Sequence, residues 1–274
     1  MSIAGRREER VGLEDLVVKE ESESKARLEF NVEEIMTPER VQAYIGYYEE
    51  KCNEGDWSMV AHTAKDIKIL FPDLVGELDL ENKWVNIKRR YQDRQAREDW
   101  SGAISQAECL KILFPDKMSE LNLEDSWENF KTWYEELCSG DDWGVALDTA
   151  RKLMILFPDR VEDLRLEDKR EQMENAYKKK YDKGSWWEAA RNAASFKILF
   201  SDSSMVGSEF EIMKAEFNNA CRDGRWMAAG IYAPNLKIIA AKEVKVTDQG
   251  LEFVMSSEES FEKRVEERPQ RIEM

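Results

Sequence analysis

The stretch Lys68-Ile69-Leu70-Phe71-Pro72-Asp73 (KILFPD) decides how this chain folds, because it recurs along the sequence. It appears again at 111–116 and in altered form at 154–159 and 197–202, so that its phenylalanine returns every 43 residues. A tryptophan precedes each phenylalanine by 14 residues, and a fifth copy of the repeat begins at a further tryptophan: Trp57, Trp100, Trp143, Trp186 and Trp226. An internal repeat of this length is typical of stacked helical units. We therefore predict an all-α fold, an α-solenoid of repeats of about 43 residues.

Each repeat contains a helix that begins at its tryptophan. Apolar residues at offsets 0, 3, 7, 10 and 14 from the tryptophan trace one helix face. Offset seven is alanine in all five copies, which indicates a close helix crossing: Ala64, Ala107, Ala150, Ala193 and Ala233. Offset twelve is always isoleucine and lies away from that face, so we expect burial on two sides: Ile69, Ile112, Ile155, Ile198 and Ile238.

The residues that flank this helix fit helix boundaries. Asp56, Asp99 and Asp142 stand before three of the tryptophans, where a carboxylate caps the first turn. Prolines 72, 115 and 158 end the helix, and each can start a brief helical turn. A second amphipathic helix precedes the tryptophan in every unit, with an aromatic residue nine positions before it.

The run from Tyr48 to Asp73 resembles the tetratricopeptide class of helical hairpin. It has a Gly55-Asp56-Trp57 turn, a small residue at Ala64 and a closing Pro72. The repeat is longer than the tetratricopeptide unit and closer in length to HEAT and armadillo units, and it lacks the usual Leu-Gly pair of the first helix. The resemblance covers about residues 38–240, and it implies a curved solenoid with a binding surface for a partner that it does not specify.

The repeats divide the chain into four parts. Residues 1–36 are charged and are expected to be flexible, residues 37–241 form the helical repeat domain, and residues 256–274 are expected to be a mobile tail. Between them, residues 242–255 alternate apolar and polar around a turn, as in a β-hairpin. We expect this hairpin to cap the exposed end of the solenoid, and strand addition by a partner is the alternative.

The composition limits the partners. The chain of 274 residues has a formal net charge of −16, which opposes generic binding to nucleic acid or anionic membranes. It has no apolar run long enough to span a membrane and no secretory leader, so we expect a cytoplasmic location. Its four cysteines have no close pairing, so we predict reduced thiols and neither a metal site nor any other cofactor.

Two sets of residues are candidates for a partner surface. One is an aromatic ladder on the second helices, which alternatively packs in the core: Tyr48, Tyr91, Tyr134 and Tyr177. The other is the basic run Lys88, Arg89 and Arg90 within segment 88–97, with a second basic segment at 178–183. These segments are either solvated helix ends, which we favour, or a face for nucleic acid.

No catalytic pattern emerges from the sequence. His62 is the only histidine, and the residues at its position in the other repeats share no chemistry: Ser105, Asp148, Arg191 and Ile231. There is no glycine-rich phosphate loop and no nucleophile elbow. We therefore predict a non-enzymatic scaffold that binds a protein or peptide, with a nucleic-acid-associated helical protein as the alternative.

Overall fold

The computed structural model describes residues 36–200, 209–241, 243–247 and 250–254, and helices dominate it. The predicted flexible segment before Met36 and the predicted tail lie outside the described residues. The helices form pairs, each with an outer and an inner member. The outer helices are α3 (Pro38–Glu54), α5 (Trp84–Ala96), α7 (Trp127–Ser139), α9 (Leu166–Asp182) and α11 (Glu209–Arg222). The inner helices are α4 (Trp57–Leu70), α6 (Trp100–Leu113), α8 (Trp143–Leu156), α10 (Trp186–Phe200) and α12 (Trp226–Ala240).

The predicted helix boundaries are largely confirmed. Every inner helix starts at a repeat tryptophan, and the Asp56 and Asp99 carboxylates accept hydrogen bonds from the backbone N–H groups of Met59 and Gly102. Asp142 makes no such bond, so the expected cap is missing from α8. Each proline after an inner helix opens a 3₁₀ helix: η1 (Pro72–Leu78), η3 (Pro115–Leu121) and η5 (Pro158–Leu164). Two further 3₁₀ turns, η2 (Leu80–Lys83) and η4 (Leu123–Ser126), lead into α5 and α7.

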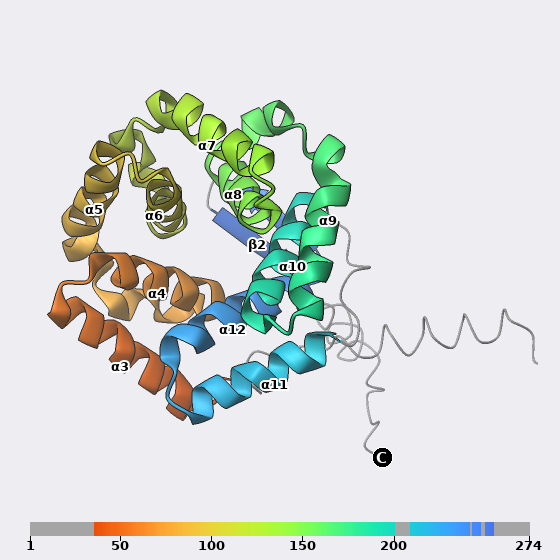
Figure 1. Cartoon of the computed structure of the whole chain (residues 1–274). Coiled ribbons are helices and arrows are strands. Elements are labelled where there is room, and N and C mark those ends of the chain that lie inside the picture. The colour runs from red at the N-terminus through yellow and green to blue at the C-terminus, as the bar shows by residue number, and fades with distance from the viewer. Residues whose placement is uncertain (1–35, 201–208, 242, 248–249, 255–274) are drawn as a thin grey trace, which may run out of the picture.

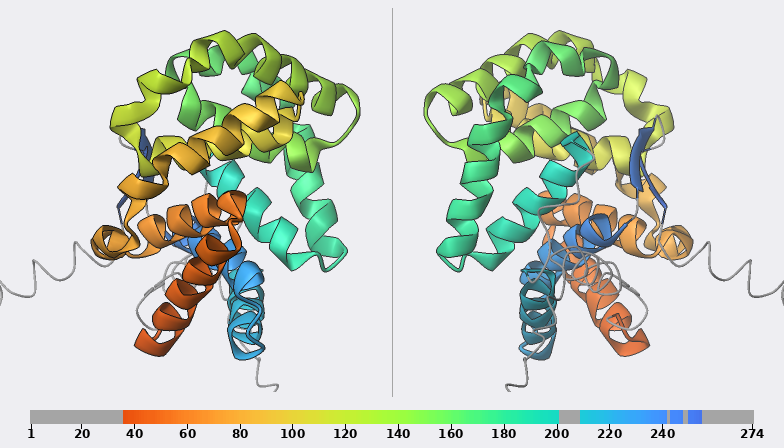
Figure 2. Two further views of the ribbon diagram at one scale, coloured as in Figure 1. Left: turned by 90° about the vertical axis from the view of Figure 1, so that its left-hand side faces the viewer. Right: turned by 90° about the vertical axis from the view of Figure 1, so that its right-hand side faces the viewer.

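The five pairs form the predicted curved array of helical repeats, and the array closes into a ring (Figure 1). Inner helix α12 packs against α4, and the start of outer helix α3 meets outer helix α11 (Figure 2). There the Arg40 guanidinium donates a hydrogen bond of 2.9 Å to the Asn218 side chain and lies over the Phe217 ring. The rotation from one unit to the next therefore brings the fifth unit onto the first.

The closing contact repeats a contact found within the array. Lys237 Nζ of α12 donates to the Ile69 carbonyl at the end of α4, at 2.6 Å. Lys68 Nζ of α4 donates to the Ile112 carbonyl at the end of α6, also at 2.6 Å. Both lysines stand eleven residues after their tryptophan, and a cation near the last carbonyls of a helix is favourable. The closure is thus one more interface between successive repeats.

The inner helices are buried on both predicted sides. The five alanines at the repeat position are 3% exposed or less, in agreement with a close helix crossing. The five isoleucines are 7% exposed or less and lie near the carboxyl ends of the inner helices. One side of each inner helix therefore meets its outer partner and the neighbouring inner helices, and the other faces the centre of the ring.

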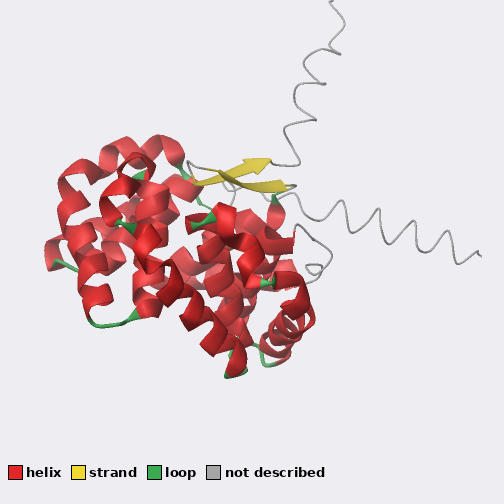
Figure 3. Cartoon of the chain, turned by 90° about the horizontal axis from the view of Figure 1, so that it is seen from above, coloured by secondary structure: helices red, strands yellow, loops and turns green. Residues whose placement is uncertain are grey.

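The predicted hairpin is present, as β1 (Glu243–Thr247) paired antiparallel with β2 (Gly250–Val254). It lies across one end of the ring, against α6, α8 and α10, and Lys237 of α12 lies 5.1 Å from the Phe253 ring centroid (Figure 3). Its apolar residues pack on the core: Val244, Val246, Leu251 and Phe253. The predicted hairpin cap is therefore confirmed, although the first repeat covers the face of the terminal repeat that we expected the hairpin to cover. The hairpin instead closes the end of the ring that the isoleucines line.

Removing the hairpin should loosen this end of the ring. We expect a chain that stops after Ala241 to exchange amide hydrogens about tenfold faster or more in the last turns of α6, α8 and α10, because their apolar side chains lose their cover. Hydrogen exchange followed by mass spectrometry measures this, with a chain that stops after Ser256 as the control. Faster exchange confined to α12, or self-association through it, would instead support a terminal cap.

Candidate functional site

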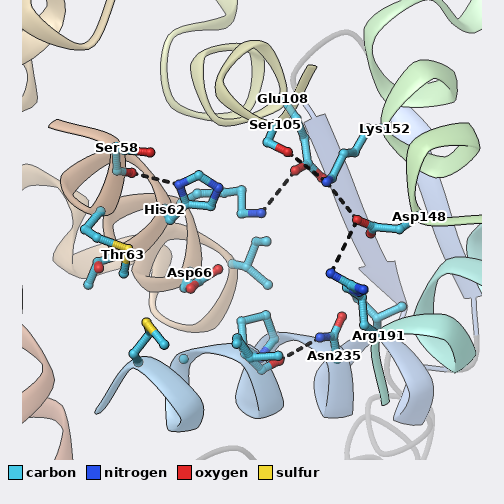
Figure 4. A pocket seen from close by; sticks show the side chains of 18 of the residues that line it. Ser58, His62, Thr63, Asp66, Ser105, Glu108, Asp148, Lys152, Arg191 and Asn235 are labelled. Carbon is cyan, nitrogen blue, oxygen red and sulfur yellow. Dashed lines mark hydrogen bonds and ion pairs between the residues drawn. The ribbon is translucent and has the colours of Figure 1, made fainter. Parts of the chain in front are cut away.

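A cavity of about 320 Å³ occupies the centre of the ring. All five inner helices line it, and α3 adds Tyr44 and Tyr47 (Figure 4). The hairpin and the isoleucines close one end. The other end is formed by the first turns of the inner helices, where Trp187 and Met227 are 42% and 58% exposed. We call this space the central cavity, and the polar residues that the inner helices contribute to its lining are Ser58, His62, Thr63, Lys65, Asp66, Ser105, Glu108, Asp148, Arg151, Lys152, Arg191 and Asn235.

A buried carboxylate joins three inner helices at one repeat position. Glu108 of α6 accepts from Lys65 of α4 at 3.1 Å and from Arg151 of α8 at 2.6 Å. All three residues stand eight positions after their tryptophan, and the Glu108 side chain is 1% exposed. Burial alone would raise the pKa of Glu108, but the Arg151 and Lys65 charges outweigh it and lower this pKa to about 2. Glu108 is therefore ionised and held rigidly at neutral pH.

A second carboxylate, Asp148 of α8, extends the charged chain to α10. It accepts from Arg151 at 3.0 Å and from Lys152 at 2.7 Å, and its side chain is 5% exposed. Burial would raise the pKa of Asp148, but Lys152, Arg151 and Arg191 lower it well below its usual range. Arg191 of α10 comes only within 4.0 Å of Asp148.

Arg191 is the least compensated cation of the central cavity. Asp148 at 4.0 Å is its nearest carboxylate among the described residues, a distance too long for a hydrogen bond. Its Nε is buried and has no partner there, and the guanidinium carbon lies 5.2 Å from the centroid of the Trp187 ring. Because a guanidinium offers five N–H donors, Arg191 can still bind an acceptor from a ligand.

The opposite wall, on α4, presents hydrogen-bond acceptors. Asp66 accepts a hydrogen bond of 3.2 Å from the Tyr44 hydroxyl, and burial raises the pKa of Asp66 to about 6 despite the nearby Lys65. His62 lies one turn earlier on the same face, with Nδ1 at 2.7 Å from the Ser58 carbonyl. Burial, followed by the charge of Lys65, lowers the pKa of His62, so the ring is neutral at pH 7.

Tyr44 reaches the cavity because residue 230 is glycine. A Cβ at Gly230 would lie 2.1 Å from the Tyr44 hydroxyl oxygen, so any side chain there would displace the tyrosine. The same position is larger in the other four repeats: Ala61, Ile104, Leu147 and Ala190. The contact between Tyr44 and Asp66 is thus specific to the closure between the fifth and first repeats.

The third wall, on α12, is mostly apolar. Ile231, Pro234 and Ile238 line the cavity, while Asn235 Nδ2 donates to the Ile231 carbonyl at 2.6 Å. Pro234 has no N–H, so the Gly230 carbonyl lacks its usual intrahelical donor. The central cavity therefore combines a donor wall, an acceptor wall and an apolar wall.

The aromatic ladder lies in the core rather than on a surface, as the packing alternative expects. Tyr48, Tyr91, Tyr134 and Tyr177 are 3% exposed or less. The hydroxyl groups of Tyr48 and Tyr134 donate to the carbonyls of Leu78 and Leu164, and that of Tyr91 pairs with Ser126 Oγ. The prediction that these tyrosines contact a partner does not hold, because a partner cannot reach them while the helices stay packed.

The basic segments lie on outer helices, and some of their cations are paired with acids. Lys88 Nζ lies 2.8 Å from Glu120 and over the Trp84 ring. Arg89 and Arg90 share a shallow surface depression with two carboxylates, Asp56 and Asp93. In the second segment, Lys178 and Lys180 pair with Glu174 and Glu188, each at 2.7 to 2.8 Å. These segments do not form part of the central cavity.

The other sequence-based expectations concern metals, thiols and membranes. The four cysteines all carry free thiols, as predicted: Cys52, Cys109, Cys138 and Cys221. Within the described ranges, no group of histidine, cysteine and acidic side chains is arranged to hold a metal ion. None of the helices described here has the length and apolar character needed to cross a bilayer.

One position of the internal repeat, five residues after the tryptophan, lines the central cavity in all five units. His62, Ser105, Asp148, Arg191 and Ile231 share one repeat position and all face the cavity. Their dissimilar chemistry does not exclude a shared site, because ring closure brings all five residues to the same cavity. Comparisons of the chain with protein-family models, with curated proteins and with solved structures found no match.

Proposed function

We propose that this protein binds a small organic anion in the central cavity. The observation that supports this most is Arg191, a cation in an enclosed space whose nearest carboxylate is 4.0 Å away and already bonded to two other cations. A volume of about 320 Å³ lies within the range of small-molecule sites. Charged groups that are fixed in an enclosed site attract an opposite charge more strongly than they do in water.

The charge of the lining supports an anionic ligand. Although the whole chain carries a net charge of −16, cations outnumber carboxylates in the central cavity. The cations are Lys65, Arg151, Lys152 and Arg191, and the carboxylates are Asp66, Glu108 and Asp148. Glu108 is bonded to Lys65 and Arg151, and Asp148 to Arg151 and Lys152, so the cation on the α8 and α10 side that lacks a directly bonded carboxylate is Arg191.

The proposal concerns binding, and it includes no catalytic step. The scaffold for a protein or peptide partner stays a prediction, and such a partner would have to approach the outer helices, because ring closure encloses the faces of the inner ones. The nucleic-acid alternative stays a prediction as well, and the pairing of Lys88 and Lys180 with carboxylates weakens it.

The proposal is tested by calorimetry with a panel of small carboxylates and phosphate esters. We expect Arg191→Gln to weaken binding of the anion that binds best by about tenfold or more, the usual effect of losing a charge-assisted hydrogen bond. Arg89→Gln, which removes an exposed arginine from the outside of α5, is the matched control and should leave binding unchanged. Equal affinity in both variants, or no binding by any member of the panel, would contradict the proposal.

A further inference from the structure

We propose that the ligand of the central cavity is a zwitterion, with an amine that binds the Asp66 and His62 wall and an acid that binds Arg191 and Lys152. This inference rests on the proposed function and specifies its ligand class. It follows from the way donors and acceptors are divided between the two walls.

Asp66 offers one free carboxylate oxygen. The Tyr44 hydroxyl donates to Oδ2, and no hydrogen bond reaches Oδ1 from the described residues. The Gly230 carbonyl, also in the cavity lining, lacks its usual donor because Pro234 has no N–H. A β-carbon placed on Gly230 would lie 3.3 Å from Asp66 Oδ2, so α12 approaches Asp66 closely at this residue.

His62 adds a third acceptor to this wall. Its Nδ1 lies 2.7 Å from the Ser58 carbonyl, and a carbonyl only accepts, so Nδ1 holds the proton. In the neutral imidazole, Nε2 then has a free lone pair, and the ring lies between Ser58 and the cavity interior (Figure 4). Asp66, the Gly230 carbonyl and His62 together match an ammonium group, which has three donors and no acceptor.

The donor wall is separate from the acceptor wall. Figure 4 shows Asp66 and His62 on one side of the cavity and Lys152 and Arg191 on the other, with α12 along the edge between them. The α12 residues that line this edge are apolar and suit a hydrocarbon linker: Ile231, Pro234 and Ile238. A ligand with one charged group at each end of a short apolar segment would satisfy both walls.

An acid without an amine would satisfy only one wall. It would leave Asp66 Oδ1 without a donor, which is unfavourable in an enclosed site. Sites built to pair a ligand N–H discriminate strongly against analogues that lack it. We therefore expect an amino acid to bind at least about tenfold more tightly than the acid of equal length without its amine.

The test compares matched ligands by calorimetry at pH 8, where Asp66 is ionised. The probes are glycine, ω-aminobutyrate, ω-aminohexanoate and ω-aminooctanoate, each beside the acid in which a methyl group replaces the amine. Hydroxy acids of the same lengths are a third set of ligands, and they test whether binding requires an ammonium group or only a neutral hydrogen-bond donor. In the wild type, we expect one length of amino acid to bind more tightly than its two partners.

Asp66→Asn should abolish this preference and leave affinity for the simple acid unchanged or improved, since the amide keeps the size of the side chain. Asp93→Asn on the outside of α5 is the matched control and should change nothing. Arg191→Gln should weaken both members of each pair. Equal binding of amino acid and simple acid in the wild type, or a preference that survives in Asp66→Asn, would overturn the inference. If no acid binds at all, the proposed function itself fails.

Discussion

Replacing Glu108 by alanine should cost the ring about 3–5 kcal/mol of stability, the usual effect of removing one partner from a buried ion pair. Glu108 is 1% exposed and bonds Lys65 and Arg151, whose side chains are 12% and 9% exposed. Without it, Arg151 keeps only Asp148, and Lys65 loses the only carboxylate with which it forms an ion pair in the described structure. Chemical denaturation followed by circular dichroism measures the loss.

A surface pair provides the control for this prediction. Glu124 pairs with Arg160 on the outside of the ring and is 71% exposed, so Glu124→Ala should cost less than about 1 kcal/mol. The double variant Glu108→Met with Lys65→Met should recover much of the loss, because it removes both charges of this pair and leaves Arg151 paired with Asp148. A loss for Glu108→Ala no larger than that for Glu124→Ala would show that the network is fully solvated.

The lowered pKa of Glu108 also predicts how the stability of the protein changes at acid pH. The pKa of Glu108 is lowered from 4.5 to about 2, so the native state binds its proton more weakly than the unfolded chain. Its contribution is therefore fully present above about pH 4.5 and is lost as the pH falls through about 2. In Glu108→Ala this part of the acid response should be missing.

The sequence predicted the units of the fold better than their arrangement. Residues that pack between helices repeat, so Trp57, Ala64 and Ile69 and their equivalents revealed the inner helices and both buried faces. Ring closure depends on the small rotation between neighbouring units, which follows from side-chain sizes at every interface. No residue pattern within a single repeat records that rotation.

The central cavity could not be predicted from the sequence, for a related reason. Positions five and eight after the tryptophan face the central cavity, where side chains of different repeats pair with one another, so no single residue type is needed at either position in every repeat. Position eight reads Lys65, Glu108 and Arg151 in the first three repeats, an alternation of charge that the structure shows to be one bonded chain. In a closed repeat array, a position that varies in chemistry between constant ones is thus a candidate for the lining of a shared site.

Asp66→Asn should stabilise the protein by on the order of 2 kcal/mol at pH 8, although we expect it to remove amine binding. Burial raises the pKa of Asp66 from 3.8 to about 6, against the opposing effects of Lys65, His62 and the Tyr44 hydroxyl, and Glu108 adds to the rise. The native state thus binds the Asp66 proton more tightly than the unfolded chain, and ionising this group costs stability.

The sign of the effect fixes its pH dependence. The favourable contribution of protonated Asp66 is fully present below about pH 3.8 and is lost as the pH rises through about 6. The variant has no such loss, so its advantage should be near zero at pH 4 or below and complete by pH 8. Glu108 stays ionised at pH 4, so it should not produce the difference. The Asp66 charge raises the pKa of His62, so any change in the titration of His62 follows from the loss of that charge.

Thermal unfolding of the wild type and Asp66→Asn between pH 4 and 8 measures this difference, with Asp93→Asn again as the control. A constant difference across the range would mean that Asp66 is already solvated and does not provide a strained acceptor. A difference that grows with pH, together with loss of amine binding, would identify Asp66 as a residue retained for its ligand at the expense of stability. Such a trade-off is expected of binding groups and not of structural ones, because selection for packing alone would favour the neutral amide.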